Sequence, residues 1–258
     1  MASAAPAGLP LFYKDLTPLS SQTHANWSVK AMESASFFAQ THAVPLTTEE
    51  FGVAQRFYPI VFSDGPSPVP LALFGLNEGV NVFTDENGMP GGNFYVPAYV
   101  RRYPFMLAKL SPQSEELSLC FDPSSGALGE FEEGNPVFEG TEPAPQIKEI
   151  LDFCEKFERA GATTGFFVQE LQQNKLLIPG EVTIQVGEDT QPFVYRGFQM
   201  IAQERVLELR GDVLRKMVQN GVLPLIYAHL FSLQLIQDIF NLQMQQGKMP
   251  QPNLTVPA

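Results

Sequence analysis

The sequence predicts an α+β fold, in which an antiparallel sheet-rich body carries C-terminal helices packed against it. In the first half of the chain, short apolar runs alternate with turn signals, which is typical of a strand meander. In the second half, apolar residues recur at helical spacing. With 258 residues, of which 44% are hydrophobic, the chain is long enough to bury a substantial core and too apolar to be disordered.

Most of the strands are expected in the first half. The run 58–62 ends at the turn Ser-Asp-Gly-Pro, and the continuous apolar run 69–76 is typical of a central strand buried on both faces. A turn at 77–79 is expected to return the chain through a strand at 80–84. The remaining predicted strands form two pairs, 106–110 with 117–121 and 182–186 with 193–195.

The predicted helices have recognisable start and stop signals. Thr47 and Glu50 have the spacing of a capping box ahead of a short helix, and a second short helix is expected at 97–103. An amphipathic stripe over 147–157 predicts a longer helix, which Gly161 is expected to end. Further helices are expected at 166–173, at about 205–220, where Gly221 follows, and at about 224–244.

We expect one domain over residues 1–258. Its parts are a sheet-rich body at 11–121, an acidic loop or linker at 122–146 and a helix-rich part at 147–246, with mobile ends at 1–10 and 247–258. A single compact unit is preferred over two because the connecting acidic loop is short.

The net charge of −12 is concentrated in one stretch. Residues 115–158 hold 12 acidic and 2 basic residues, a net charge of −10, and the rest of the chain is nearly neutral. This balance argues against a general nucleic-acid binder and against a protein that binds anionic membranes, because both need a basic face. The stretch is either a solvated surface or a docking surface for a basic partner.

The segment 87–114, in contrast, contains no acidic residue and carries the candidate binding residues. Arg101 and Arg102 are flanked by Tyr99 and Tyr103, and such a group can hold a carboxylate, a phosphate or a peptide end through fork-like hydrogen bonds. In the alternative interpretation, one arginine pairs with an internal acid and the tyrosines fill the core. Because adjacent residues point in different directions, at most one of the two arginines is expected to face any given pocket.

No catalytic, metal or cofactor motif is recognisable in the sequence. The three histidines lack metal-binding spacing, and the phosphate-binding and dinucleotide-binding glycine motifs are missing, so we expect no metal site and no cofactor. His229 lies in a very apolar predicted helix, either as a hydrogen-bonded core residue or as a ligand contact at the edge of a pocket. Cys120 and Cys154 are expected to be small buried hydrophobic residues.

The ends and the hydropathy lead us to expect a cytoplasmic protein. The first residues lack the basic segment of a signal peptide, although secretion by a route without such a signal stays open. The most apolar stretch, 222–236, is shorter than a bilayer requires, so no membrane span is expected. The sequence predicts no particular oligomeric state.

Three segments, 44–62, 72–105 and 223–233, match a known pattern. The second contains the long and unusual string Tyr-Val-Pro-Ala-Tyr-Val-Arg-Arg-Tyr-Pro-Phe, and the third reads Leu-Pro-Leu-Ile-Tyr-Ala-His-Leu-Phe-Ser-Leu. In order and spacing the chain resembles the SapC family of bacterial proteins from about Leu11 to Ile236, and not the peptide-transporter permease of the same name. The resemblance implies a link to the bacterial surface layer, and to genes near TonB-dependent outer-membrane receptors, flavin-dependent halogenase-like proteins and cupin-like hydroxylases. It implies no catalytic residues.

Two functions therefore stand as hypotheses. The first is a non-enzymatic accessory protein of the surface-layer or receptor system, which recognises a peptide or protein partner through Tyr99, Arg101, Arg102 and Tyr103. The alternative is an enzyme that modifies peptides or small molecules alongside the halogenase-like or hydroxylase-like proteins. In that case, His229, Arg101 and a carboxylate such as Asp85 are expected to converge in one cleft.

Overall fold

The computed structural model describes residues 8–111, 116–186 and 192–248, and their contacts group into two compact units. Unit 1 comprises the chain up to Ala35 together with Tyr99–Arg159, and unit 2 comprises Ser36–Ala98 together with the chain from Ala160 onward. Each unit is built from two separate chain segments, so its boundaries differ from those of the predicted sheet-rich and helix-rich parts. The single domain stays a prediction, and the expected mobile ends lie largely outside the described residues.

Unit 1 contains two small antiparallel sheets, a hairpin and the first part of the longest helix. Its core contains Phe105, Phe121, Val137, Ile147 and Cys154, all at most 5% exposed. The elements are the sheet β1 (Thr17–Pro18), β7 (Leu117–Phe121) and β6 (Phe105–Lys109), the sheet β8 (Leu128–Gly129), β2 (Ser28–Val29) and β9 (Asn135–Pro136), the hairpin β10 (Phe138–Glu139) and β11 (Glu142–Pro143), the turn η2 (Pro123–Ser125), and residues 145–159 of α4.

The sequence predicted part of this unit. The β6–β7 strand pair is confirmed, with its turn outside the described residues. The prediction of a plain loop at 122–146 is wrong, because that stretch contains β8 to β11 and supplies fully buried core residues such as Val137. Cys120 and Cys154 are free and buried, as expected.

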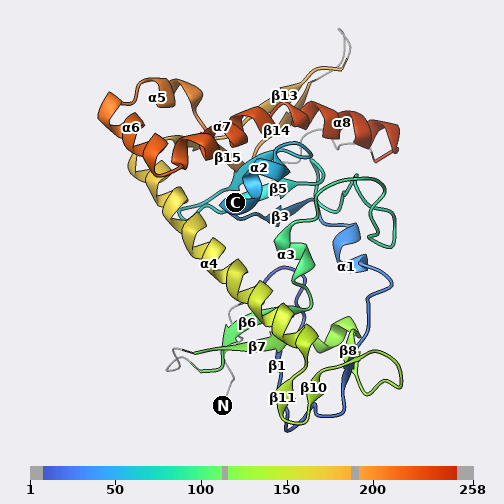
Figure 1. Ribbon diagram of the computed structural model, residues 1–258. Coiled ribbons are helices and arrows are strands. Elements are labelled where there is room, and N and C mark those ends of the chain that lie inside the picture. The colour runs from blue at the N-terminus through green and yellow to red at the C-terminus, as the bar shows by residue number, and fades with distance from the viewer. Residues whose placement is uncertain (1–7, 112–115, 187–191, 249–258) are drawn as a thin grey trace, which may run out of the picture. The chain divides into compact units, whose positions relative to one another are not determined.

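Helix α4 (Pro145–Gln173) continues beyond its predicted end, as Figure 1 shows. Gly161 does not end it: its φ is not in the left-handed region, and a Cβ added at this position would meet no atom within 4 Å. From the residue before it onward, the residues at helical spacing are buried in unit 2: Ala160, Thr164, Phe167 and Leu171. Burial of this face outweighs the roughly 1 kcal/mol by which a helical glycine is less favourable than alanine.

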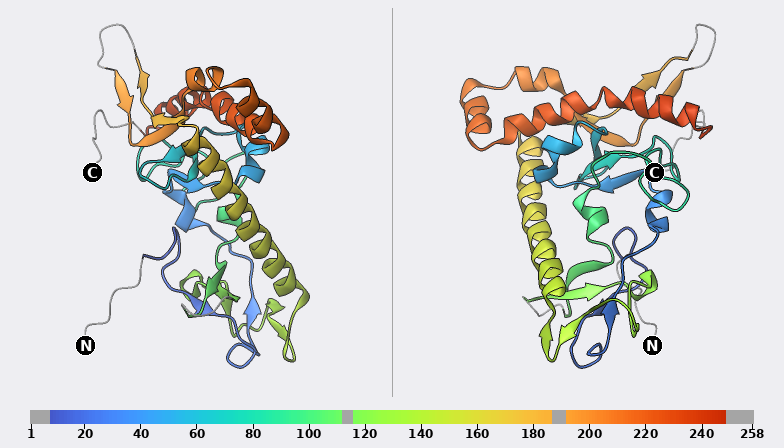
Figure 2. Two further views of the ribbon diagram at one scale, coloured as in Figure 1. Left: turned by 90° about the vertical axis from the view of Figure 1, so that its left-hand side faces the viewer. Right: turned by 45° about the vertical axis from the view of Figure 1, so that its right-hand side comes forward.

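Unit 2 contains a five-stranded antiparallel sheet with helices on it (Figures 1 and 2). The sheet order is β12 (Leu177–Pro179), β15 (Phe198–Ile201), β4 (Ile60–Ser63), β5 (Pro70–Leu73) and β3 (Ala43–Pro45), and a separate hairpin pairs β13 (Val182–Ile184) with β14 (Phe193–Tyr195). The helices are α1 (Ser36–Ala39), η1 (Thr48–Glu50), α2 (Phe51–Ala54), α5 (Gln203–Leu207), α6 (Gly211–Gln219), α7 (Val222–Ser232) and α8 (Leu235–Gln245), and the short α3 (Ala98–Arg101) follows the first segment of this unit.

The α+β fold with C-terminal helices packed on a sheet body is confirmed. Helix α7 packs on the sheet, where the Ser232 hydroxyl accepts a hydrogen bond from the amide of Ile60 at 2.9 Å. The β13–β14 hairpin is confirmed, and its turn lies outside the described residues. The strand predicted at 80–84 is wrong: beyond a single bridge at Thr84, the described chain there has no ladder, and Asn81 instead donates a side-chain hydrogen bond to the carbonyl of Phe38.

The predicted capping box at Thr47 and Glu50 is present and is part of a larger buried network. Glu50, 5% exposed, accepts hydrogen bonds from the amide and the hydroxyl of Thr47 at 2.9 and 2.8 Å. Its other carboxylate oxygen accepts from the hydroxyl of Tyr95 at 2.9 Å and from the amide of Ala98 at 2.7 Å. One carboxylate thus joins the start of a helix to the segment that leads into α3.

One stretch of unit 2, Val222–Gln245, is long and apolar enough to cross a membrane by length and composition. This is weak evidence, because the core helix of a soluble protein passes the same test. Within it, Ile226, Ala228, His229 and Ser232 are buried against the rest of the unit. The expectation of no membrane span stays a prediction.

Candidate functional site

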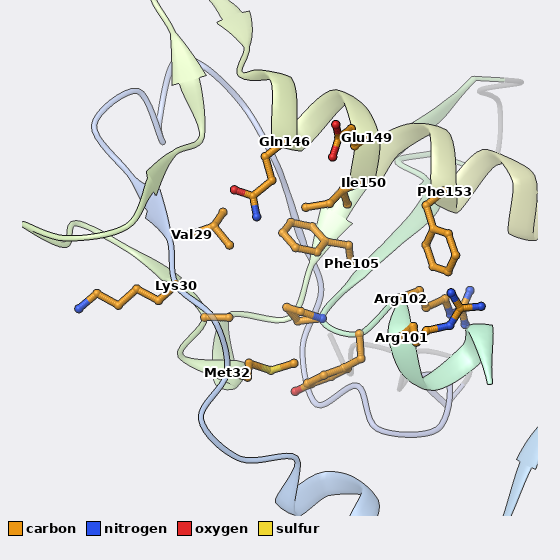
Figure 3. A pocket seen from close by; sticks show the side chains of 13 residues that line it. Val29, Lys30, Met32, Arg101, Arg102, Phe105, Gln146, Glu149, Ile150 and Phe153 are labelled. Atoms are coloured by element: carbon orange, nitrogen blue, oxygen red, sulfur yellow. The ribbon is translucent and has the colours of Figure 1, made fainter. Parts of the chain in front are cut away.

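Unit 1 contains a cavity of about 360 Å³ that includes both predicted arginines (Figure 3). Helix α4 forms one wall, from which Gln146, Ile150 and Phe153 point into the cavity. The residues that line it are Val29, Lys30, Met32, Arg101, Arg102, Tyr103, Pro104, Phe105, Ala127, Gln146, Glu149, Ile150 and Phe153. The lining therefore combines three cations with a mainly apolar surface and a single acid, Glu149.

Arg101 and Arg102 lie over successive turns of α4. The exposed Arg101, the last residue of α3, has its guanidinium carbon 5.2 Å from the centre of the Phe153 ring. The guanidinium carbon of Arg102 lies 4.4 Å from the centre of the Phe157 ring. Both arginines belong to the residues that line the cavity, and the expectation that at most one of them faces it stays a prediction.

Arg102 is held rigidly and yet has an unsatisfied donor. Only 6% of its side chain is exposed. Its guanidinium carbon lies 4.5 Å from the centre of the Tyr99 ring and 4.4 Å from that of Phe157. One of its terminal nitrogens lies 3.5 Å from a carboxylate oxygen of Glu158. Its Nε is buried and has no hydrogen-bond partner among the described residues. A buried donor without an acceptor is energetically unfavourable.

The two predicted tyrosines support the arginines from the core of unit 1. Tyr99 and Tyr103 are 5% and 6% exposed. The Tyr99 hydroxyl donates to the carbonyl of Leu11 at 3.1 Å, and the Tyr103 hydroxyl lies 3.4 Å from the carboxylate of Asp122. Burial raises the pKa of both tyrosines. For Tyr99, the positive charge of Arg102 partly opposes this rise in pKa. Tyr99 lies against the Arg102 guanidinium and helps to position it, whereas the ring of Tyr103 packs against Phe12 and Tyr13.

Several cavity residues were not identified from the sequence. Gln146, Glu149, Ile150 and Phe153 lie at helical spacing on one face of α4, and only Ile150 belonged to the predicted stripe. That spacing is a signal that sequence reasoning could have used. Gln146 also has a buried carbonyl oxygen with no partner among the described residues. Lys30, from a different part of unit 1, carries no comparable signal.

His229 lies in unit 2 and does not line this cavity. It is fully buried, its Nε2 accepts a hydrogen bond from the amide of Ile201 at 3.0 Å, and its Nδ1 lies 2.7 Å from the carbonyl oxygen of Ile60. An amide can only donate and a carbonyl can only accept, so the proton resides on Nδ1. Burial lowers the pKa of His229 to about 4, so it is neutral at physiological pH.

The other groups considered for chemistry are engaged locally. Asp85 accepts hydrogen bonds from the amides of Asn87 and Met89, both at 2.9 Å, within its own turn. Burial raises the pKa of Cys154 to about 11, which disfavours a reactive thiolate. In the part of the chain that the structure describes, no group of three or more potential metal ligands is present.

A comparison with protein families places this chain among known sequences. The model of one family, described as SapC, matches residues 19–239, which cover more than four-fifths of the chain. No curated protein and no solved structure matches. The matched range includes the whole string from Tyr95 to Phe105 and the His229 segment.

Proposed function

The chain belongs to the SapC family. On that premise we propose that it is a non-enzymatic accessory protein of a surface-layer or TonB-dependent receptor system, acting in the cytoplasm or after export. In this proposal, the cavity of unit 1 binds the carboxylate end of a peptide or protein partner. The observation that carries the proposal is Arg102, a buried and clamped guanidinium whose Nε has no partner among the described residues.

The cavity has the chemistry that a peptide end requires. The guanidinium groups of Arg101 and Arg102 offer fork-like donors for one carboxylate, and their positions against Phe153 and Phe157 reduce the entropy lost on binding. Phe105 and Ile150 offer an apolar surface for the last side chain of the partner. Glu149 repels additional negative charge, which favours a carboxylate over a dianionic phosphate.

The alternative, a modifying enzyme, has less support. Both ring nitrogens of His229 are occupied by backbone partners and the residue is fully buried, so it does not offer an acid or base to a substrate. Asp85 is likewise held within its own turn. For this reason we propose binding as the function.

Ligand preference tests the proposal directly. A fluorescein-labelled peptide with an apolar last residue and a free carboxylate should bind the full chain at least about tenfold more tightly than its amidated form, since a charge-assisted pair contributes about 1.5–3 kcal/mol. Arg101→Gln should reduce this preference, because only Arg102 then remains as a fork-like donor, whereas Lys109→Gln, an equal charge change at an exposed residue outside the cavity lining, should retain it. Equal affinity for both peptides would contradict the proposal.

Partner identity needs a second experiment. The chain immobilised in native lysate should capture a surface-layer protein or an outer-membrane receptor, and the Arg101→Gln variant should capture much less of the same protein. If no partner is recovered and the chain instead turns over a candidate peptide or small-molecule substrate, the accessory function is wrong and the enzymatic alternative replaces it.

A further inference from the structure

The five-stranded sheet of unit 2 has two unlike faces. Side chains alternate between the faces along each strand. Ile60, Phe62 and Ala72 point to one face and are fully buried, with Phe62 against Phe167 of α4. Leu71 and Leu73 point to the other face, which is apolar and only half-buried.

A cavity of about 470 Å³ lies over this half-buried face, separate from the cavity of unit 1. Its floor includes Val61, Leu71, Leu73 and Phe198 from three strands, β4, β5 and β15. Its walls come from the β13–β14 hairpin and from α8, which pack on one another and lie side by side in Figures 1 and 2. The volume is within the usual range for small-molecule sites, about 300–1,000 Å³.

One polar atom of this cavity's lining residues lacks a partner. Tyr195, from β14, lines the cavity, and its hydroxyl is buried with no hydrogen bond to any described residue. Burial also raises the pKa of Tyr195 to about 12, so the hydroxyl stays protonated and can donate a hydrogen bond. A ligand acceptor at this hydroxyl would satisfy a donor that is otherwise buried at a cost.

The charged groups at the cavity disfavour an anionic ligand. Asp64 and Glu78 are exposed acids that belong to its lining. The one cation, Arg196, is paired with Glu181, with its Nε 2.7 Å from the carboxylate. Burial lowers the pKa of His42, although the charge of Glu78 partly opposes this, so the imidazole adds no fixed positive charge at neutral pH.

We propose that unit 2 binds a neutral, mainly apolar small molecule that lies on the half-buried sheet face and accepts a hydrogen bond from the Tyr195 hydroxyl. The apolar floor supplies the driving force by removing ligand surface from water. The hydroxyl orients the single polar group of the ligand. The acidic rim excludes carboxylates of the same size.

A fluorescent apolar probe tests this site in the full chain. N-phenylnaphthylamine, which is neutral, should bind saturably with one probe per chain. Val182 lines the cavity from a strand, where an aromatic residue is well accommodated, so Val182→Trp should fill the cavity and lower the affinity for the probe at least about tenfold. Arg101→Gln, in the cavity of unit 1, should leave the affinity for the probe unchanged. Leu71→Gln provides a second cavity variant, and thermal unfolding verifies that each variant is folded.

Competition identifies the ligand class. Decanol should displace the probe at a concentration at least about tenfold lower than decanoate does. Tyr195→Phe should lower the affinity for decanol about five- to tenfold, and it should change the affinity for the probe by less than about twofold. Absence of saturable probe binding to the folded chain, or equal binding by folded cavity variants, would overturn the site. Stronger competition by decanoate would overturn the ligand class. Neither outcome affects the peptide site of unit 1, which Arg101→Gln reports separately.

Discussion

Substitution of His229 should change how stability depends on pH. In the folded chain the pKa of His229 is lowered from 6.5 to about 4, because burial opposes the charged form. Below about pH 6.5 the unfolded chain therefore takes up a proton that the folded chain does not, and the free energy of unfolding falls as the pH drops toward 4. Stability from this group is thus present above pH 6.5 and lost below it.

The magnitude follows from the shift. At about 1.4 kcal/mol for each pKa unit, the loss is roughly 2 kcal/mol between about pH 7.5 and pH 5, and reaches about 3 kcal/mol near pH 4. His229→Gln can retain both backbone hydrogen bonds, but a glutamine cannot titrate, so the variant should lack this part of the pH dependence. At neutral pH the variant should be less stable than the unaltered chain.

Urea unfolding at several pH values measures the effect. The stability difference between the unaltered chain and His229→Gln should narrow by roughly 2 kcal/mol from about pH 7.5 to pH 5. His42→Gln is the matched control: its pKa is also lowered by burial, but the side chain is half-exposed, so a smaller change is expected. A constant difference for His229→Gln across this range would refute the buried neutral imidazole.

Three further substitutions test the packing of unit 2. Glu50→Gln should lower the free energy of unfolding by about 2–4 kcal/mol, because its carboxylate accepts four hydrogen bonds, whereas the exposed Glu49→Gln should change it by less than about 0.5 kcal/mol, both measured by urea unfolding. Gly75→Ala should lower the thermal midpoint, with a loss of about 1–3 kcal/mol, because the added carbon collides with the carbonyl of Val80. Tyr195→Phe, without ligand, should leave stability unchanged or raise it by up to about 1 kcal/mol, and a clear loss would show that its hydroxyl is bonded.

The sequence predicted those elements whose signals are local. The capping box of Thr47 and Glu50, the β6–β7 strand pair and the β13–β14 hairpin depend on residues close together in the chain, and all three are confirmed. The turn signal at 77–79 was also local, but beyond a single bridge at Thr84 the strand expected after it does not form, and the side chain of Asn81 bonds there to the distant carbonyl of Phe38. A partner so far along the chain has no signature in the short segment itself.

The errors in α4 and in the acidic stretch have the same origin. A glycine such as Gly161 is a plausible helix end when only neighbours are considered, but the buried face beyond it, including Thr164 and Leu171, packs into unit 2 and keeps the helix intact. Likewise, the buried Val137 lies in a segment whose Gly, Pro and Glu content and lack of period suggested a loop or linker. In both cases tertiary burial outweighs local propensity.

The sequence could not predict how the arginine side chains of the unit 1 site are oriented. The acid-free segment drew attention to Arg101 and Arg102, which line one cavity. Which of their donors lacks a partner depends on Glu158 and Phe157, far along the chain, and no pattern near the arginines identifies these neighbours.

Much of the chain's excess negative charge lies in unit 1, which also contains the cavity with the two arginines. Unit 1 carries 14 acidic and 8 basic residues, a net charge of −6, and the most acidic stretch, 115–158, lies wholly within it. Three of its basic residues, Lys30, Arg101 and Arg102, line the one cavity. At physiological salt, charges more than about 8 Å apart are largely screened, so a small carboxylate in the cavity would sense mainly these cations together with Glu149 and Glu158, whereas a polyanion would also lie along the acidic surface. The arrangement therefore supports the proposed peptide site more than a site for nucleic acid.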